Sequence, residues 1–265
     1  MIVFSAITPH PPILIPAIGD ANLRFVEKTI KSMVRLSEEL YASNPETIII
    51  ITPHGQILPD AFSINMAQQF EVNFKDFGDL KTSIKFPGDV RLIHHYKEIL
   101  EAQLPIVLVN QPLLDHGAGV PLYFFAQGLD STKIKIVPMG PSLASNEEHY
   151  QFGMKLQEDI INDTRRIAVI ASGDLSHRLS EAAPAGFSHW AKKFDETMIN
   201  KIKHKDNNGI IKLDNDFTEE VGECGLRPII TLLGILNSVT YQPEIYSYEN
   251  PFGVGYLTVN MKLAR

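Results

Sequence analysis

Histidines in short turn motifs are the residues of this chain whose types and spacing could do chemistry. Four such motifs and one late glutamate motif lie far apart in the sequence: Thr8-Pro9-His10-Pro11-Pro12, Thr52-Pro53-His54-Gly55, Asp115-His116-Gly117, Ser172-Gly173-Asp174-Leu175-Ser176-His177 and Gly222-Glu223-Cys224-Gly225. At least three of the five follow an apolar run that is typical of a strand. Two neutral imidazoles and one carboxylate are what an open Fe(II) or Zn(II) site needs. These motifs therefore indicate a metalloenzyme, provided that folding brings them together.

His10 and His54 are the first candidate metal ligands. Each ends a Thr-Pro-His tripeptide, and each tripeptide follows an apolar run. Taken alone, either residue could be an ordinary turn histidine at the end of a strand. If the two strands run parallel, both imidazoles lie at the carboxyl edge of one sheet, where open α/β folds build their sites. The repeated tripeptide therefore favours a pair of ligands.

His177 and His116 are candidates for catalytic roles. His177 follows two serines and an aspartate that could orient its ring. It could transfer protons at neutral pH, serve as a third metal ligand or belong to a cap network, and spacing alone does not separate these roles. His116 could donate a hydrogen bond to a substrate or to dioxygen, or it could simply bond to its neighbour Asp115.

Glu223 is the candidate carboxylate ligand. A carboxylate just before a helix is also stabilised by the helix dipole, which is the purely structural interpretation. The adjacent Cys224 could bind a soft metal as a thiolate, although a lone cysteine is more often a packing residue. The other histidines are expected to face solvent, except for one at the rim of the pocket: His94, His95, His149 and His204 in the first group, and His189 at the rim.

The elements that must position these turns alternate between strands and helices. Strands are expected at 1–8, 47–52, 106–110, 134–138, 167–171 and 253–261, and helices at 21–43, 89–101, 121–128, 147–162, 190–203 and 225–236. Segments 61–74 and 239–248 alternate more and suit outer or antiparallel strands, whereas 206–216 suits a surface loop. The unbroken β-branched run at 47–52 favours a strand covered on both faces. The pattern predicts one α/β domain over residues 1–265, with a central, mostly parallel or mixed sheet sandwiched between helices.

Composition limits the partners. The 24 Lys+Arg and 31 Asp+Glu give a net charge of −7, and no basic run is present, so we expect neither nucleic acid nor membrane as a partner. No apolar run approaches the roughly 20 residues of a membrane span, and the start suits a first strand better than a signal peptide. The single cysteine excludes an intrachain disulfide. We therefore expect a cytoplasmic protein, and base rates of symmetric assembly favour a homodimer.

The ordered motifs, from Pro9-His10-Pro11-Pro12 to Pro251-Phe252-Gly253-Val254-Gly255-Tyr256, resemble the class III extradiol ring-cleavage dioxygenases. The closest similarity is to the catalytic subunit of the protocatechuate 4,5-dioxygenase type. The resemblance implies that His10, His54 and Glu223 hold a non-haem Fe(II) ion, that His177 is the acid/base, and that His116 faces the pocket for substrate and oxygen. It implies that a catechol-like aromatic diol is opened with O2.

Three further expectations stay open. The chain is also similar to the Memo proteins, which share the fold and carry a cysteine near the position of Cys224; this implies a metal-binding or redox protein that uses copper or zinc. Members of this wider group occur beside a radical-SAM protein and a small companion protein, which implies a role in a modification system. A zinc-dependent hydrolase could use the same pocket. Arg178 and Arg227 lie close in sequence to the motifs and could bind an anionic substituent.

Overall fold

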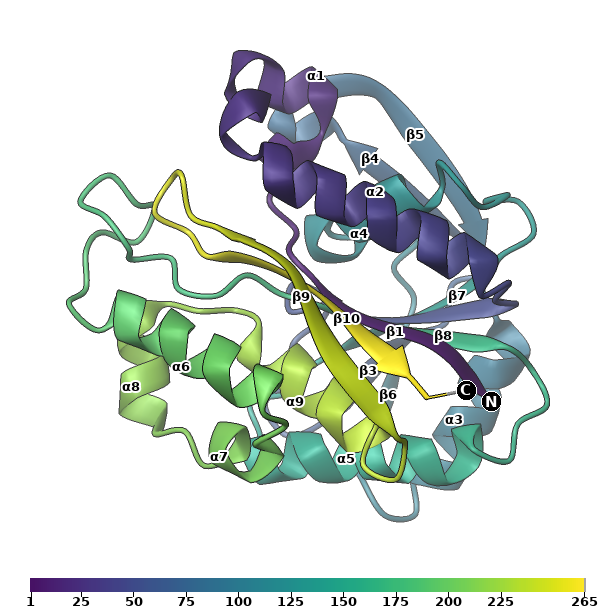
Figure 1. Cartoon of the computed structure of the whole chain (residues 1–265). Coiled ribbons are helices and arrows are strands. Elements are labelled where there is room, and N and C mark those ends of the chain that lie inside the picture. Colours follow the sequence, from purple (N-terminus) through teal and green to yellow (C-terminus); the bar gives the residue numbers. More distant parts are fainter. Residues whose placement is uncertain (265) are drawn as a thin grey trace.

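The computed structural model describes residues 1–264, and within them a central sheet of eight strands has the order β6-β3-β7-β2-β8-β1-β10-β9 (Figure 1). The bounds of these strands are β1 (Ile2–Thr8), β2 (Thr47–Ile51), β3 (Phe62–Asn65), β6 (Ile106–Val109), β7 (Lys135–Gly140), β8 (Ile167–Ser172), β9 (Tyr241–Glu249) and β10 (Tyr256–Leu263). Strands β7, β2, β8 and β1 are parallel, whereas β3 and β10 pair antiparallel with this group. The sheet is therefore mixed, as expected from the sequence.

The parallel centre of the sheet determines where the turns meet. Ile7 of β1 and Ile51 of β2 both pair with Ala171 of β8. The three strands therefore end at the same level, and the chain leaves each of them at one edge of the sheet. Every residue of β2 and β8 is buried, because β-branched side chains point to both covered faces. The turns that carry His10 and His54 start from this edge.

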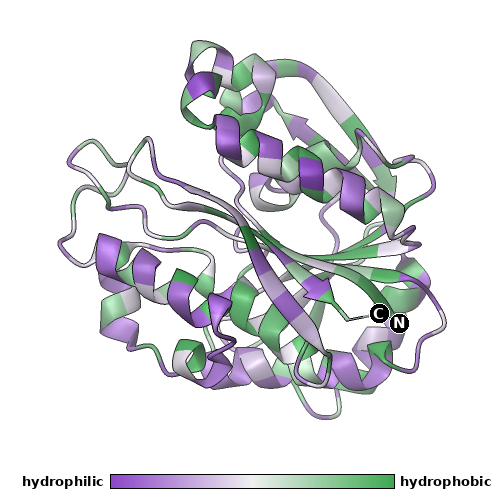
Figure 2. Ribbon diagram, viewed as in Figure 1, coloured by the Kyte–Doolittle hydropathy of each residue, from purple (hydrophilic) through white to green (hydrophobic). Residues whose placement is uncertain are grey.

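Helices cover both faces of the sheet (Figure 1). One face packs against α3 (Val90–Leu100), α5 (Asn146–Ile160), α6 (Ala191–Lys203), α7 (Asn207–Ile211), α8 (Asn215–Val221) and α9 (Leu226–Ile235). The other packs against α1 (Pro16–Gly19), α2 (Glu27–Ala42), α4 (His116–Phe125) and the hairpin of β4 (Gln69–Phe74) and β5 (Asp79–Pro87). Ile49 and Ile51 join the first core while Ile48 and Ile50 join the second, as the alternation of a strand requires. Figure 2 shows hydrophobic strands between helices that present hydrophilic residues outward.

Several expected elements differ from the structure. The expected helix at 21–43 is preceded by a 3₁₀ segment over Asp20–Phe25 and begins as an α-helix at Glu27. The expected strand at 61–74 is two strands, β3 and β4, that belong to different sheets. The expected loop at 206–216 holds α7 and the start of α8. This last prediction was wrong because Asp206 and Asp214 are helix caps, whose carboxylates accept the amides of Gly209 and Phe217.

Two histidine environments were also mispredicted. His149 was expected to face solvent but is fully buried, and its Nε2 accepts the amide of Ser142 at 3.3 Å. His116 was expected in a loop but is the first residue of α4, because the Asp115 carboxylate accepts the amide of Ala118 and caps the helix there. Among residues 1–264, none of the helices is both long and apolar enough to span a membrane.

Candidate metal centre

Three histidines from separate turns meet at the carboxyl edge of the sheet. One ring nitrogen from each of His10, His54 and His116 lies within 4.8 Å of the others. The Nε2 atoms of His10 and His54 are 3.1 Å apart, and the His54 and His116 rings are stacked with centroids 4.4 Å apart. Folding thus brings together the two Thr-Pro-His motifs, and the histidine that begins α4 completes the group.

The hydrogen bonds around His10 fix which of its nitrogens carries the proton. The Ser172 hydroxyl donates its only hydrogen to the carbonyl of Gly117, at 2.5 Å. At 3.0 Å from His10 Nδ1, the same oxygen must therefore accept a hydrogen bond from that nitrogen. His10 is consequently protonated at Nδ1 and directs the Nε2 lone pair toward His54. A histidine that binds a metal is held in this way, with its second nitrogen donating to a protein oxygen.

The donor set fits a divalent cation. Two nitrogens that bind one metal ion at about 2.0–2.1 Å lie about 3 Å apart, which agrees with the 3.1 Å between the two Nε2 atoms. Burial, followed by the nearby His54 and His116 rings, holds the pKa of His10 well below its ordinary value. Burial also lowers the pKa of His54 and of His116. The rings are therefore neutral at pH 7 and offer lone pairs to an ion of the first transition series.

One carboxylate oxygen holds His54 and His116 in place. Asp115 Oδ1 accepts both the Thr52 hydroxyl at 2.5 Å and the Ala118 amide at 3.1 Å. The Thr52 oxygen in turn accepts the His54 amide at 3.3 Å. A Cβ at Gly117 would lie 2.5 Å from the Thr52 oxygen, so the close approach of the two turns requires glycine there.

Asp174 and Cys224 lie on the buried side of His10. Asp174 Oδ1 accepts the His10 amide at 3.1 Å, and its Oδ2 is 3.8 Å from His10 Nε2. Cys224 Sγ lies 3.5 Å from the same Nε2 and accepts the Asp174 amide at 3.3 Å. Burial raises the pKa of Asp174 to about 7 and holds that of the Cys224 thiol well above its ordinary range. A Cβ at Gly173 would lie 2.2 Å from the Cα of Gly225, so glycines permit this contact between the turns.

Glu223 points elsewhere. Its Oε2 accepts the Leu226 amide at 2.6 Å, at the start of α9, and burial raises its pKa to about 7. Within the described chain, the carboxylate is not part of the histidine group, whose members are His10, His54 and His116. A role for Glu223 as a metal ligand therefore stays a prediction, and it requires the side chain to leave its cap. The sulfur of the next residue already lies beside His10.

His177 lies near the cluster with an unsatisfied ring nitrogen. Its Nδ1 is buried and has no hydrogen-bond partner within residues 1–264. Burial lowers its pKa, and the nearby His54 ring lowers it further. The turn is held by Ser176, whose amide donates to Asp195 at 2.9 Å and whose hydroxyl donates to the Val221 carbonyl at 3.0 Å. Asp195 was not identified from the sequence, because it lies on a helix remote from every motif.

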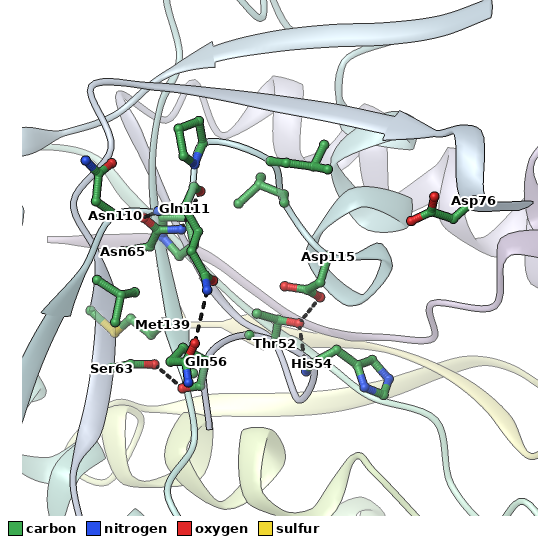
Figure 3. Close-up of a pocket in the computed structure, with 17 residues that line it drawn as sticks. Thr52, His54, Gln56, Ser63, Asn65, Asp76, Asn110, Gln111, Asp115 and Met139 are labelled. Atoms are coloured by element: carbon green, nitrogen blue, oxygen red, sulfur yellow. Dashed lines mark hydrogen bonds between the residues drawn. The ribbon is translucent and has the colours of Figure 1, made fainter. Parts of the chain in front are cut away.

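A pocket of about 540 Å³ opens beside His54 (Figure 3). Its polar lining comes from the turn after β2, from β3, from the turn between β4 and β5, and from the segment that joins β6 to α4: Thr52, His54, Gln56, Ser63, Asn65, Asp76, Asn110, Gln111 and Asp115. Leu113, Leu114 and Met139 add apolar surface. The volume is that of an ordinary small-molecule site.

The two arginines proposed from the sequence do not line this pocket. Arg178 Nη1 instead donates to the Glu220 carbonyl at 3.1 Å, and Arg227 neighbours the Glu223 carboxylate. His94 and His204 are exposed, as expected, and His189 is exposed with its ring against Phe187. The half-buried His95 bonds to Asp159 at 2.8 Å.

The class of protein is defined by a mixed α/β sheet that carries, at its carboxyl edge, three histidines with the spacing of a metal-binding group. The chain belongs to the family described as the catalytic LigB subunit of aromatic ring-opening dioxygenase, which matches residues 5–259. The expected resemblance is thus confirmed at the level of the family.

Two other proteins resemble this chain. Protein CA_C1420 of Clostridium acetobutylicum is 34% identical over 258 residues, which are 94% of this chain and 55% of that protein. The chain therefore spans about half the length of this relative. An uncharacterized protein of Escherichia coli K12, JW3007, has the same fold, with a TM-score of 0.67 over 98% of this chain and 99% of its own. Its sequence identity is 19%, so this similarity concerns the fold alone.

Proposed function

We propose that this protein is a non-haem Fe(II)-dependent extradiol dioxygenase that opens the ring of a catechol-like diol with O2. Membership of a ring-opening dioxygenase family supports the reaction type. The observation that carries the proposal is the 3.1 Å pair of Nε2 atoms on His10 and His54, with the His10 lone pair directed into the pair. The ion would supply positive charge for the diol oxygens and redox chemistry for dioxygen.

The residues around the pair divide the remaining work. His177 Nδ1 accepts a proton from a diol hydroxyl and returns it to the ring-opened product, because its lowered pKa keeps the ring neutral at pH 7. His116 faces either the aromatic ring of the substrate or the dioxygen. Its own ring stacks on that of His54, and the centroid of the Phe77 ring lies 5.2 Å away. The neighbouring pocket accepts the remainder of the substrate.

The third metal ligand distinguishes two versions of the proposal. In the dioxygenase version it is Glu223, whose carboxylate would have to release the Leu226 amide in order to hold the ion. In the second version it is Cys224, whose sulfur is 3.5 Å from His10 Nε2. Two imidazoles and a thiolate favour copper or zinc and a redox or metal-binding role, and binding would release the thiol proton.

Loading the metal-free protein under anaerobic conditions tests both versions. Equal samples receive Fe(II), Cu(I) or Zn(II), and elemental analysis measures the bound metal. Each loaded form is then mixed with a panel of catechols while oxygen uptake and the absorbance of ring-opened product are followed. Oxygen uptake by the Fe(II) form, lost in Glu223→Gln and retained in Cys224→Ser, supports the dioxygenase. Tight copper binding that Cys224→Ser abolishes, with no turnover, supports the second version.

The histidine triplet also suits catalytic zinc, which often has three imidazole ligands. The Zn(II) form is therefore assayed against ester and amide substrates without oxygen. Hydrolysis that requires zinc and is indifferent to oxygen would replace the dioxygenase by a zinc hydrolase. His94→Ala is the matched control in each assay, because its histidine is exposed and remote from the cluster in sequence.

A further inference from the structure

We propose that the pocket beside His54 selects a ring that carries a protonated amine, and that it disfavours a ring with a carboxylate. The inference rests on the proposed function for the diol at the metal, but its charge argument concerns the pocket alone. The acidic groups of the lining are Asp76 and Asp115, and His54 is its histidine. Within the described residues, neither lysine nor arginine lines the pocket.

Asp115 provides a free carboxylate oxygen. The two hydrogen bonds that it accepts, from the Thr52 hydroxyl and from the Ala118 amide, both end on Oδ1. Oδ2 accepts no hydrogen bond from residues 1–264, and it lies 3.9 Å from the point where a Cβ on Gly55 would stand, in the wall of the pocket. Figure 3 shows Asp115 bonded to Thr52 through one oxygen, with the other oxygen facing the space between the lining residues. An ammonium group is the complement of such an oxygen.

Three amide residues of the lining, Gln56, Asn65 and Gln111, are hydrogen-bonded to one another. Gln111 donates its side-chain amide to Gln56 at 3.0 Å, while its backbone amide donates to Asn65 Oδ1 at 3.0 Å. Asn65 in turn donates to the Gln111 carbonyl at 2.8 Å. This part of the wall is polar and neutral, so the charge preference of the pocket comes from its two carboxylates.

Asp76 adds a second negative charge at the mouth. It lies in the turn between β4 and β5, is exposed, and extends toward the pocket in Figure 3. An exposed carboxylate contributes less than a half-buried one, because water and salt screen it. Asp115 therefore sets the preference, and Asp76 strengthens it.

Three catechols of nearly equal size test the charge preference directly. 3,4-Dihydroxybenzylamine, 4-methylcatechol and 3,4-dihydroxybenzoate differ in the charge of one substituent, so the contribution of the diol to binding cancels in their ratios. Dissociation constants are measured anaerobically on the Fe(II)-loaded protein. We expect the amine to bind at least about tenfold more tightly than the methyl compound, and the benzoate to bind most weakly. Equal affinities, or tighter binding of the benzoate, would overturn the proposal.

Variants assign the preference to the two carboxylates. Asp115→Asn retains an oxygen for Thr52 and Ala118, and any loss of diol binding at the cluster is shared by all three catechols; the variant should therefore weaken amine binding about tenfold more than it weakens 4-methylcatechol binding. Asp76→Asn should weaken it about threefold and reduce its dependence on salt. Asp216→Asn, an exposed aspartate outside the pocket, is the matched control. Loss of the preference in the control, or its persistence in Asp115→Asn, contradicts the assignment.

Binding of two simpler compounds, benzylamine and benzoate, to the metal-free protein separates this inference from the proposed function. Benzylamine and benzoate lack the diol, and on metal-free protein their binding reports on the charge of the pocket alone. Benzylamine binding that Asp115→Asn weakens, in a protein without oxygenase activity, would retain the pocket assignment and reject the dioxygenase. Ring opening of the benzoate at least as efficiently as of the amine would retain the dioxygenase and reject the pocket assignment.

Discussion

The two halves of the histidine cluster are held in different ways. His10 is 1% exposed, and both its Nδ1 and its backbone amide are hydrogen-bonded to buried side chains, those of Ser172 and Asp174. His54 is exposed, and its ring borders the open pocket. We call His10 the closed half of the cluster and His54 the open half. The closed half fixes the direction of one lone pair, while the open half leaves room for a ligand. A metal site that must also admit a substrate needs both properties.

Replacing the closed histidine should have the largest effect. His10→Ala removes the ligand whose Nε2 lone pair is fixed by the bond from Nδ1 to Ser172, so metal affinity should fall by more than about 100-fold, beyond the about 10–100-fold typical of lost outer partners. His54→Ala should cost less, because His116 can move toward the vacant position. Metal titration of the metal-free protein measures both, with His94→Ala as the control. Equal losses at His10 and His54 would show that the two halves are equivalent.

The partners of the two halves give the next largest effect. Ser172→Ala leaves His10 Nδ1 buried without an acceptor, so metal affinity should fall about 10–100-fold and the free energy of unfolding by about 1–3 kcal/mol. Thr52→Val removes one of the two donors to Asp115 Oδ1 and should change metal affinity only a few-fold. Competition titration and chemical denaturation measure these changes. A larger effect at Thr52 than at Ser172 would reverse the comparison.

The pH dependence of stability reports on the closed side through Asp195, which holds the turn of His177. Burial raises the pKa of Asp195 from 3.8 to about 6. The folded state thus retains a proton that the unfolded state has lost, so this group makes stability fall as pH rises from about 4 to about 6, and adds no change above that. Asp195→Asn should remove this part of the slope, on the order of 2 kcal/mol. Denaturation at pH 4, 5, 6 and 7 measures it; an unchanged slope in the variant would show that Asp195 is not buried as a protonated acid.

The sequence was sufficient to predict the framework and the meeting of His10 with His54. The β-branched run at 47–52 and the repeated Thr-Pro-His tripeptide required a covered sheet and two imidazoles at one edge, and the register of β1, β2 and β8 provides both. Such features follow from local composition and from the geometry of parallel strands. They need no knowledge of tertiary contacts.

Details that depend on the direction of a single side chain could not be predicted. Glu223 and Cys224 are adjacent in the sequence, and the structure directs the Cys224 sulfur toward His10. The turn that carries them packs closely on Gly173, a contact between segments remote in sequence. Likewise, burial of His149 depends on the packing of α5, which no local pattern showed. Asp206 and Asp214 could have been identified, since an aspartate before a short apolar insert is a capping signal.

The smallest predicted effect concerns the rim of the open half. Phe77 is 42% exposed, and its ring lies 5.2 Å from that of His116, in an edge-on arrangement. Phe77→Ala should therefore change the free energy of unfolding by less than about 1 kcal/mol and leave metal affinity unchanged, because neither buried surface nor a proposed ligand is lost. The Michaelis constant for a catechol should rise several-fold, since the ring closes one side of the approach to His116, while the turnover number should change little. A drop in metal affinity, measured by the same titration as for His10→Ala, would show that the rim also orders the cluster and that the open half is less independent than its exposure implies.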